Sequence, residues 1–350
     1  MTTPTAGTVP TATPLVDATV VTAAYAMARW DLTCRAIEST LAQQPLPREI
    51  LVAVDHNPEL LARLRDRWEH PGDGGHPRIR IVPSRYDGHH GAALTTAAEL
   101  AESTFLISLD DDAAADPGWL KRMLDGLREP NVLAVGGAPL PVYETRRPTW
   151  LPPEFNWVFG CAYVGLPTHR APILHLIGTT MAVRRDDLLA IGGIHSDDFP
   201  DMEMSHRLRL LRPAGRLLYD PEATVRHFVP TVRTTWRYFR HRIFSVNRSK
   251  VWAVREMGEA GHLGAERGFV TRIAPAGILH GLRDALRGDL GGLARAGAIL
   301  VGLALAAGGY IAGSTDLVLR DLTGRPGPKT GWHPAPRDRA RRNVEDDTTV

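Results

Sequence analysis

The chain has 350 residues, 43% of them hydrophobic and 23% charged, so it is long and apolar enough for a globular protein with one large domain or two. Its 41 basic and 39 acidic side chains leave a formal net charge of +2, which argues against a strongly basic surface, and we expect no nucleic-acid partner. The two cysteines, Cys34 and Cys161, exclude a disulfide framework and indicate a reducing, cytoplasmic compartment.

The two ends of the chain differ in composition from the rest. Residues 1–17 are rich in Thr, Pro and Ala and lack the positive segment and apolar core of a signal peptide, so we expect a flexible leader. Residues 325–350 are rich in Pro and charged side chains, which predicts a disordered tail.

Strand and helix patterns alternate through residues 18–116. Short apolar runs predict strands at 18–24, 49–54, 78–82 and 104–109, and helical patterns predict helices at 31–44, 58–69 and 91–102. Strands that alternate with helices form βαβ units with right-handed crossovers and a parallel sheet. We therefore predict an α/β domain whose first half binds a nucleotide.

Three consecutive carboxylates, Asp110, Asp111 and Asp112, follow the fourth predicted strand. Ligands bind beyond the carboxyl ends of the strands in open α/β sheets. Extended alternation places Asp110 and Asp112 on one side, where two like charges need a cation. A divalent cation held by carboxylate oxygens, which also carries substrate phosphates, meets that need. An acidic loop that caps the next helix is the alternative, although Asp116-Pro117 already supplies a separate cap.

Two common phosphate-binding motifs are missing from the sequence. No Gly-x-Gly-x-x-Gly follows the first predicted strand, and no Gly-x-x-x-x-Gly-Lys-Ser/Thr occurs, so an acid-held metal is the natural way to hold a nucleotide. Asp55, at the end of the second strand, is placed to bind a base or ribose, and Arg85, after the third, to face a base or phosphate. A turn-forming role for Asp55 and a solvated position for Arg85 are the alternatives.

Residues 117–250 have a different character. Apolar runs predict strands at 135–142, 177–183, 216–219 and 223–229, with short helices at 186–190 and 204–211. The stretch 150–163 is dense in aromatic side chains, among them Trp157, and forms either a stacking platform for a sugar or lipid or a satellite core.

An acidic loop at 197–203 precedes the last of these predicted helices. Its carboxylates Asp198, Asp201 and Glu203 lie at a helix N-terminus, which favours their ionised form, and an ionised carboxylate there is a candidate general base. His227 lies on a later strand, where a neutral imidazole could complete the metal site begun by the earlier carboxylates. A purely structural role for that histidine is the alternative.

In their order and spacing, these motifs resemble the family 2 glycosyltransferases, which have the GT-A fold. The resemblance covers residues 18–250 and rests on Ile50-Leu-Val-Ala-Val-Asp55, Leu106-Ile-Ser-Leu-Asp-Asp-Asp-Ala113, Ile177-Gly-Thr-Thr-Met-Ala-Val-Arg-Arg185, and the run from Gly192-Gly193 through Asp201-Met-Glu203 and Arg207-Leu-Arg209 to His227. It implies an α/β GT-A domain with a mostly parallel central sheet flanked by helices, followed by a C-terminal helical appendage.

The resemblance also implies roles for single residues. Asp55 matches the acid that contacts the nucleotide base, and Asp110 and Asp112 match the Asp-x-Asp pair that holds Mn²⁺ or Mg²⁺ on the sugar-nucleotide diphosphate. His227 matches the histidine that completes the metal site in several members. We expect Asp110, Asp111 and Arg85 to contact the donor as well.

The catalytic base of the family aligns with Asp201. Pro200 stands where the family has Glu, and Glu203 stands where it has a second Asp, so Asp198, Asp201 and Glu203 all stay candidates and we favour Asp201. The implied mechanism is inverting: the base takes a proton from an acceptor hydroxyl, which attacks the anomeric carbon, while metal and basic groups neutralise the departing diphosphate.

Cations at Arg242, Arg248 and Lys250 lie in a stretch that resembles the end of the catalytic domain in members that glycosylate polyprenyl-phosphate-linked sugars. There they could meet the leaving diphosphate or an acceptor phosphate, with Trp157 as a further acceptor contact, whereas a solvated helix face is the alternative. By family frequency we expect a UDP-sugar donor. The expected acceptor is a lipid-linked saccharide, a polysaccharide or a secondary metabolite.

Residues 251–324 are predicted to be helical. Within them, 296–313 is uncharged and just long enough to span a membrane, and the arginines before it would keep the catalytic domain at the cytoplasmic face. The preceding segment 273–290 is amphipathic and could lie on the membrane interface. We favour membrane association, and a buried or homodimer-forming helix of a soluble enzyme is the alternative.

Two other functions stay open on sequence alone. A nucleotidyltransferase would bring a Gly-rich basic loop after the first strand, which Tyr25-Ala-Met-Ala-Arg29 matches poorly. A non-catalytic, carbohydrate- or membrane-binding relic is disfavoured by the intact carboxylates, although Pro200 keeps it open.

Overall fold

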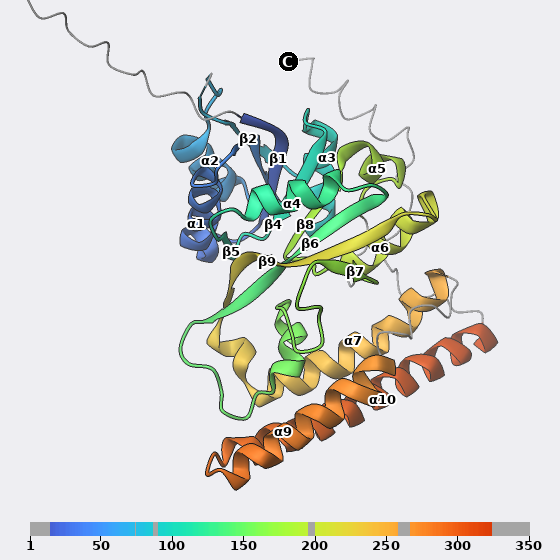
Figure 1. Ribbon diagram of the computed structural model, residues 1–350. Coiled ribbons are helices and arrows are strands. Elements are labelled where there is room, and N and C mark those ends of the chain that lie inside the picture. Colours follow the sequence, from blue (N-terminus) through green and yellow to red (C-terminus); the bar gives the residue numbers. More distant parts are fainter. Residues whose placement is uncertain (1–14, 74, 87–89, 195–199, 258–266, 324–350) are drawn as a thin grey trace, which may run out of the picture.

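A computed structural model describes residues 15–323 apart from 74, 87–89, 195–199 and 258–266. The described residues form a nine-stranded mixed sheet in the order β3-β2-β1-β4-β8-β6-β9-β5, with β7 paired to β9. Helices cover both faces of the sheet, and three long C-terminal helices lie together along one edge of the molecule (Figure 1). The predicted tail and most of the predicted leader lie outside the described residues.

The first half of the chain confirms the predicted βαβ pattern. Its strands β1 (Leu15–Ala24), β2 (Leu46–Val54), β3 (Arg78–Pro83) and β4 (Phe105–Leu109) pair in parallel, and its helices are α1 (Trp30–Leu41), α2 (Pro58–Trp68) and α3 (His90–Leu100). The first strand begins earlier than predicted, because Leu15 and Val16 pair with the start of β2. The predicted leader therefore ends before residue 15.

The second half adds strands of both directions. Its elements are β5 (Ala113–Ala115), α4 (Trp119–Arg128), β6 (Val132–Tyr143), β7 (Ala171–Ile173), β8 (Thr180–Arg184), α5 (Arg185–Ala190), α6 (Pro200–Leu211) and β9 (Arg216–Val229). Strand β8 is antiparallel to both β4 and β6, whereas β6 and β9 are parallel. The sheet thus changes direction next to β4, the strand that carries the carboxylates.

Several boundaries in this half differ from prediction: β6 begins at Val132 and not at residue 135, and β8 begins at Thr180 and not at residue 177. Two further differences concern β9 and α6. Strand β9 is continuous where two strands were expected, because it pairs with β6 on both sides of one register shift. Helix α6 begins at Pro200, so Asp201 and Glu203 lie in its first turn and not in a preceding loop. Proline is favoured at the first helical position because its missing N–H is not needed there.

Apolar residues on both faces of the sheet form the core. One cluster packs α3, α5 and α6 against one face, and a second packs α4 against the other. Trp119, 1% exposed, anchors the second cluster, and its indole N–H donates to Thr180 Oγ1 over 2.9 Å. Rigid packing on both sides fixes the strand ends from which the site is built.

The C-terminal helices share a core with the aromatic stretch. The short 3₁₀ helix η2 (Pro153–Phe159) packs with α7 (Trp236–Met257), a single π-helical segment η5 (Phe269–Ile273), α9 (Ala274–Leu286) and α10 (Gly291–Thr323). Phe155, from the aromatic stretch 150–163, is buried there beside Phe239 of α7, which agrees with the satellite-core interpretation for that ring. Helix α7 crosses the predicted domain boundary at residue 250.

Helix α10 is long and apolar enough to cross a membrane. Its most apolar 18-residue window has a mean hydropathy of 1.8 and is 33% buried. A core helix of a soluble protein meets the same criteria, so this property by itself is weak evidence for a span.

Candidate active site

A cavity of about 1480 Å³ lies between the carboxyl ends of the central strands and the C-terminal helices. One side is lined by the carboxylates after β4, by Asp55 and by His227. The other side is lined by aromatic residues of η2 and by apolar residues of α10, with the cations Arg242 and Lys250 of α7 between them. The cavity therefore joins an acidic, a basic and an apolar region.

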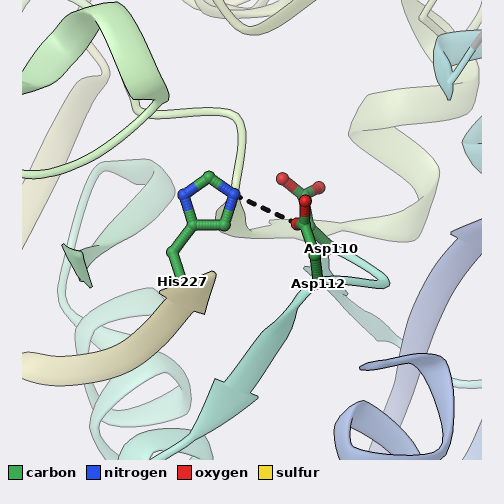
Figure 2. A group of neighbouring side chains, drawn as sticks. All are labelled: Asp110, Asp112 and His227. Carbon is green, nitrogen blue, oxygen red and sulfur yellow. Dashed lines mark ion pairs between the residues drawn. The ribbon is translucent and has the colours of Figure 1, made fainter. Parts of the chain in front are cut away.

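Asp110, Asp112 and His227 converge in this cavity (Figure 2). One potential ligand atom of each lies within 4.8 Å of the others, and His227 Nε2 is 3.0 Å from Asp112 Oδ1. The pairing of β5 with β9, which sets Ala113 opposite His227, brings the histidine beside the carboxylates. This register could not be derived from the sequence.

The three side chains fit a hard divalent cation. Two carboxylates and one imidazole are suitable ligands for Mn²⁺, and a Mg²⁺ site uses carboxylates. Asp110 Oδ1 is buried and accepts no hydrogen bond from the described residues, and its contact there is His90 Nε2 at 3.4 Å. A buried carboxylate oxygen that accepts no hydrogen bond is costly, and coordination of a cation would compensate that cost.

The electrostatics of the three groups differ. Burial raises the pKa of Asp110 above its ordinary value. Burial opposes ionisation of Asp112 too, but the hydrogen bond and charge of His227 outweigh it and lower the pKa of Asp112. Burial would lower the pKa of His227, but its hydrogen bond to Asp112 raises it to about 10. Without a cation, Asp112 and His227 therefore form a buried ion pair, and coordination by His227 would require its Nε2 to lose the proton.

Arg29 is a site residue that the sequence did not reveal. It follows β1 and places one guanidinium nitrogen 2.6 Å from Asp111 Oδ1 and another 3.1 Å from Asp112 Oδ2. Asp111 thus faces Arg29, although burial still raises its pKa to about 7. The only sequence signal was an arginine after the first strand, in Tyr25-Ala-Met-Ala-Arg29.

Asp201 faces the cavity from the first turn of α6. Its Oδ2 accepts a hydrogen bond from Gly178 N–H at 3.1 Å and its Oδ1 one from Met202 N–H at 2.9 Å. Burial raises the pKa of Asp201 despite these bonds. A positioned carboxylate with a raised pKa is a suitable general base.

The other two candidate bases are placed differently. Glu203, two residues later on the helix, lies outside the cavity lining and pairs with Arg207 at 3.1 Å. Asp198 lies outside the described residues. Geometry therefore favours Asp201 over Glu203.

Of the predicted donor contacts Asp55 and Arg85, one lines the cavity and the other does not. Asp55 lines the cavity, and its Oδ1 lies 2.5 Å from His56 Nδ1. Arg85 is half-exposed, pairs with Glu99 at 3.3 Å and is outside the cavity lining. The expected role of Arg85 at the donor is therefore not supported by its position.

Of the predicted acceptor contacts, Trp157, Arg242 and Lys250 line the cavity. Arg248 does not, because its guanidinium pairs with Asp316 of α10 at 2.6 Å. Arg233, which the sequence did not single out, lines the cavity as well.

The pKa of Lys250 is the most strongly perturbed among these cations. Burial lowers it to about 8, although the charge of Asp201 acts in the opposite direction. Lys250 therefore changes its charge in a pH range where glycosyl transfer can be assayed.

Comparisons with known proteins show the family and the fold to which this chain is similar. Residues 19–192 match the family described as glycosyl transferase family 2. The chain is 29% identical over 242 residues to a glucosyl-dolichyl phosphate glucuronosyltransferase of Haloferax volcanii, a match that covers 66% of this chain and 75% of that protein. It is 32% identical over 113 residues to the succinoglycan biosynthesis protein ExoO of Rhizobium meliloti, covering 31% of this chain and 29% of ExoO.

Among solved structures, the chain resembles the mannosyltransferase PcManGT of Pyrobaculum calidifontis in complex with GDP-Man and Mn²⁺. The TM-score is 0.54 at 18% identity, covering 90% of this chain and 82% of that one. At this identity the likeness concerns the fold, and it confirms the GT-A architecture.

Proposed function

The chain belongs to glycosyl transferase family 2 and is a glycosyltransferase, and on that premise we propose a specific reaction for it. It moves a sugar from a nucleotide-diphosphate donor to a hydroxyl group of a lipid-phosphate-linked saccharide, with inversion at the anomeric carbon and with the help of a divalent cation. The observation that supports this proposal is the single cavity in which acidic, basic and apolar linings meet. The relative that acts on a glucosyl-dolichyl phosphate points to the same acceptor class.

The donor would bind at the acidic end of the cavity. Asp110, Asp112 and His227 would hold Mn²⁺ or Mg²⁺, which would neutralise charge on the departing diphosphate. Arg29 holds Asp111 and Asp112 in place, and Asp55 is available to the nucleotide base or ribose.

Asp201 is the group that accepts the proton. The acceptor hydroxyl gives its proton to the Asp201 carboxylate while its oxygen forms a bond to the anomeric carbon, on the face opposite the departing diphosphate. The bond from that carbon to the diphosphate oxygen breaks, and its electron pair leaves with the diphosphate. Backbone N–H donors at Gly178 and Met202 fix the direction of the carboxylate throughout.

The acceptor would lie along α7 and α10. Arg242 and Lys250 are positioned for its phosphate, and Trp157 for a sugar ring or the first part of the lipid. Apolar side chains of α10, such as Leu303 and Ala306, continue the lining beyond these cations. This arrangement favours a membrane lipid as the carrier.

A transfer assay with two acceptors that share one sugar tests this proposal. One acceptor carries a lipid phosphate and the other a simple alkyl group. We expect the wild type to prefer the phosphate-bearing acceptor, and Lys250→Met to lose most of that preference through a rise in KM of about 10-fold, because one charge-assisted contact contributes about 1.5 kcal/mol. Arg248→Gln is the control, since Arg248 lies outside the cavity, and its KM should stay near that of the wild type.

The pH dependence gives the same test a second readout. The pKa of Lys250 is lowered to about 8, so its ammonium form is lost as the pH rises through that value. KM for the phosphate-bearing acceptor should therefore rise above pH 8, and Lys250→Arg, which stays protonated, should abolish that rise. Equal use of both acceptors, with no effect of Lys250→Met, would contradict the lipid-phosphate acceptor.

A further inference from the structure

The C-terminal helices expose an unusual amount of apolar surface. More than half of the large apolar side chains that the described residues expose lie between Val270 and Leu322. On α10, eight exposed positions recur at helical spacing, and none of these eight is charged; the exposed Asp321 lies outside this set. They form what we call the apolar stripe: Leu293, Leu300, Ala304, Ala307, Ile311, Thr315, Val318 and Leu322.

Ion pairs of α10 with α7, with α9 and with Asp289 connect the helix to the rest of the protein on the side away from the apolar stripe. Arg295 pairs with Asp284 and Asp289, at 2.8 and 2.7 Å. Farther along the helix, Asp316 and Asp321 pair with arginines of α7, at 2.6 and 2.7 Å. The helix is thus amphipathic along its whole length, with a charged face on α7 and α9 and an apolar face exposed.

Helix α10 is fixed along α7 by close backbone contacts, and the two helices run side by side (Figure 1). A Cβ on Gly309 would lie 2.4 Å from Phe244 O, and one on Gly313 would lie 2.3 Å from Arg248 O. If the uncharged part of α10 crossed a bilayer, this part of α7, including Arg248, would have to enter the hydrocarbon core with it. Burying such charges in a bilayer is costly, so the packing opposes a span.

Helix α9 carries the pattern of a helix that lies on a membrane surface. Exposed leucines lie on α9 at Leu279, Leu282 and Leu286, and one more, Leu290, follows the end of the helix. Leu286 is 89% exposed. Arg283 and Arg287 are exposed on the same turns. Leucines beside arginines on one face suit the boundary between acyl chains and anionic headgroups.

The catalytic cavity opens onto this surface. Val270, Tyr310 and Ile311 line the cavity and are also exposed, at 51%, 41% and 65%. Ile311 belongs to the apolar stripe, so the stripe runs past the mouth of the cavity. A lipid carrier lying in a membrane below α10 would reach the cavity without leaving its apolar surroundings.

From these features we propose that α9 and α10 lie flat on an anionic bilayer, that α10 does not span it, and that the lipid-linked acceptor enters the cavity sideways from the membrane. The apolar stripe lies in the acyl-chain boundary, and Arg283 and Arg287 contact the headgroups. The route of the acceptor rests on the proposed function, whereas the position of the helices does not.

Sedimentation of the full chain with mixed phosphatidylglycerol–phosphatidylcholine vesicles tests the surface, without donor or acceptor. Combined Leu293→Gln, Leu300→Gln and Leu322→Gln should weaken binding by on the order of 100-fold, because three exposed leucines lose their burial in lipid. Combined Leu140→Gln, Leu210→Gln and Leu211→Gln, which change three exposed leucines elsewhere, should leave binding unchanged. Equal binding by wild type and stripe variant would overturn the proposal. A second outcome would also overturn the proposal: the wild type forms a dimer in lipid-free buffer, the stripe variant does not, and the stripe variant still binds vesicles.

Thiol labelling on sealed vesicles separates a flat helix from a spanning one. The native Cys34 and Cys161 are buried, so cysteines introduced by Arg287→Cys and Thr323→Cys, which flank α10, can be followed separately. Both should react with a membrane-impermeant maleimide added outside. Protection of one of them until detergent is added would show a span and overturn the proposal. Neither measurement requires catalysis, and a failed transfer assay would leave both results intact.

Discussion

Asp201→Asn is expected to lower kcat by about 10³-fold, the usual size of a lost general base. The carboxylate faces the cavity, and burial raises its pKa above the ordinary value. An amide cannot accept the proton of the acceptor hydroxyl. Because Asp201 is not one of the three candidate metal ligands, donor affinity should change little, and the loss should appear in kcat and not in the KM for the donor.

Glu203→Gln is the matched control for this prediction. Glu203 lies in the same turn of α6, outside the cavity lining, and pairs with Arg207 of the same helix, so kcat should stay within about threefold of the wild type in its Gln variant. Thermal unfolding of both variants shows whether the backbone N–H groups at Gly178 and Met202 tolerate the amide. A large loss in Glu203→Gln with activity retained in Asp201→Asn would reassign the base.

Asp112→Asn is expected to abolish metal-dependent donor binding and with it at least about 10³-fold of the transfer rate, because the cation and its diphosphate lose a ligand. The same change leaves His227 and part of the Arg29 charge without a buried partner. Removal of one member of a buried ion pair costs about 3 kcal/mol, so the free energy of unfolding should fall as well. Donor binding in the presence and absence of Mn²⁺, followed by calorimetry, measures the first effect, and chemical denaturation measures the second.

Asp116→Asn is the control for the metal site. Asp116 lies four residues beyond Asp112 and accepts hydrogen bonds from Thr224 and Arg226 on β9. It does not line the cavity. It should lose about 1 kcal/mol of stability at most and keep donor binding. Metal-dependent binding that survives Asp112→Asn would contradict the assignment of the three ligands.

The sequence predicted most of the fold because its signals were local. Alternating apolar runs and helical patterns gave the strands up to β4, and three carboxylates after a buried strand marked the site. Asp110 and Asp112 were identified in this way, whereas the choice of Asp201 and His227 depended on the resemblance to family 2 glycosyltransferases. The structure brings all four to one cavity.

What the sequence missed depends on long-range pairing. Arg29 reaches Asp111 and Asp112 across 82 positions of the chain, and only the parallel pairing of β1 with β4 brings them together. Arg85 and Arg248 were plausible by type, but ion pairs with Glu99 and Asp316 direct them away from the cavity. Composition made α10 a candidate span, and only its packing on α7 argues for a different position.

A thermal-shift titration with UDP, GDP and TDP, each with and without Mn²⁺, tests the central claim most directly. That claim is that the carboxylates after β4 and His227 form a metal-dependent site for a nucleotide diphosphate. A nucleotide at about 100 times its Kd stabilises the folded protein by about 2.7 kcal/mol, which should raise Tm by about 5 °C. We predict such a rise for one nucleotide, only with Mn²⁺ present, and its loss in Asp112→Asn. No rise with any nucleotide in the presence of Mn²⁺, or a rise that does not need the metal, would contradict the account.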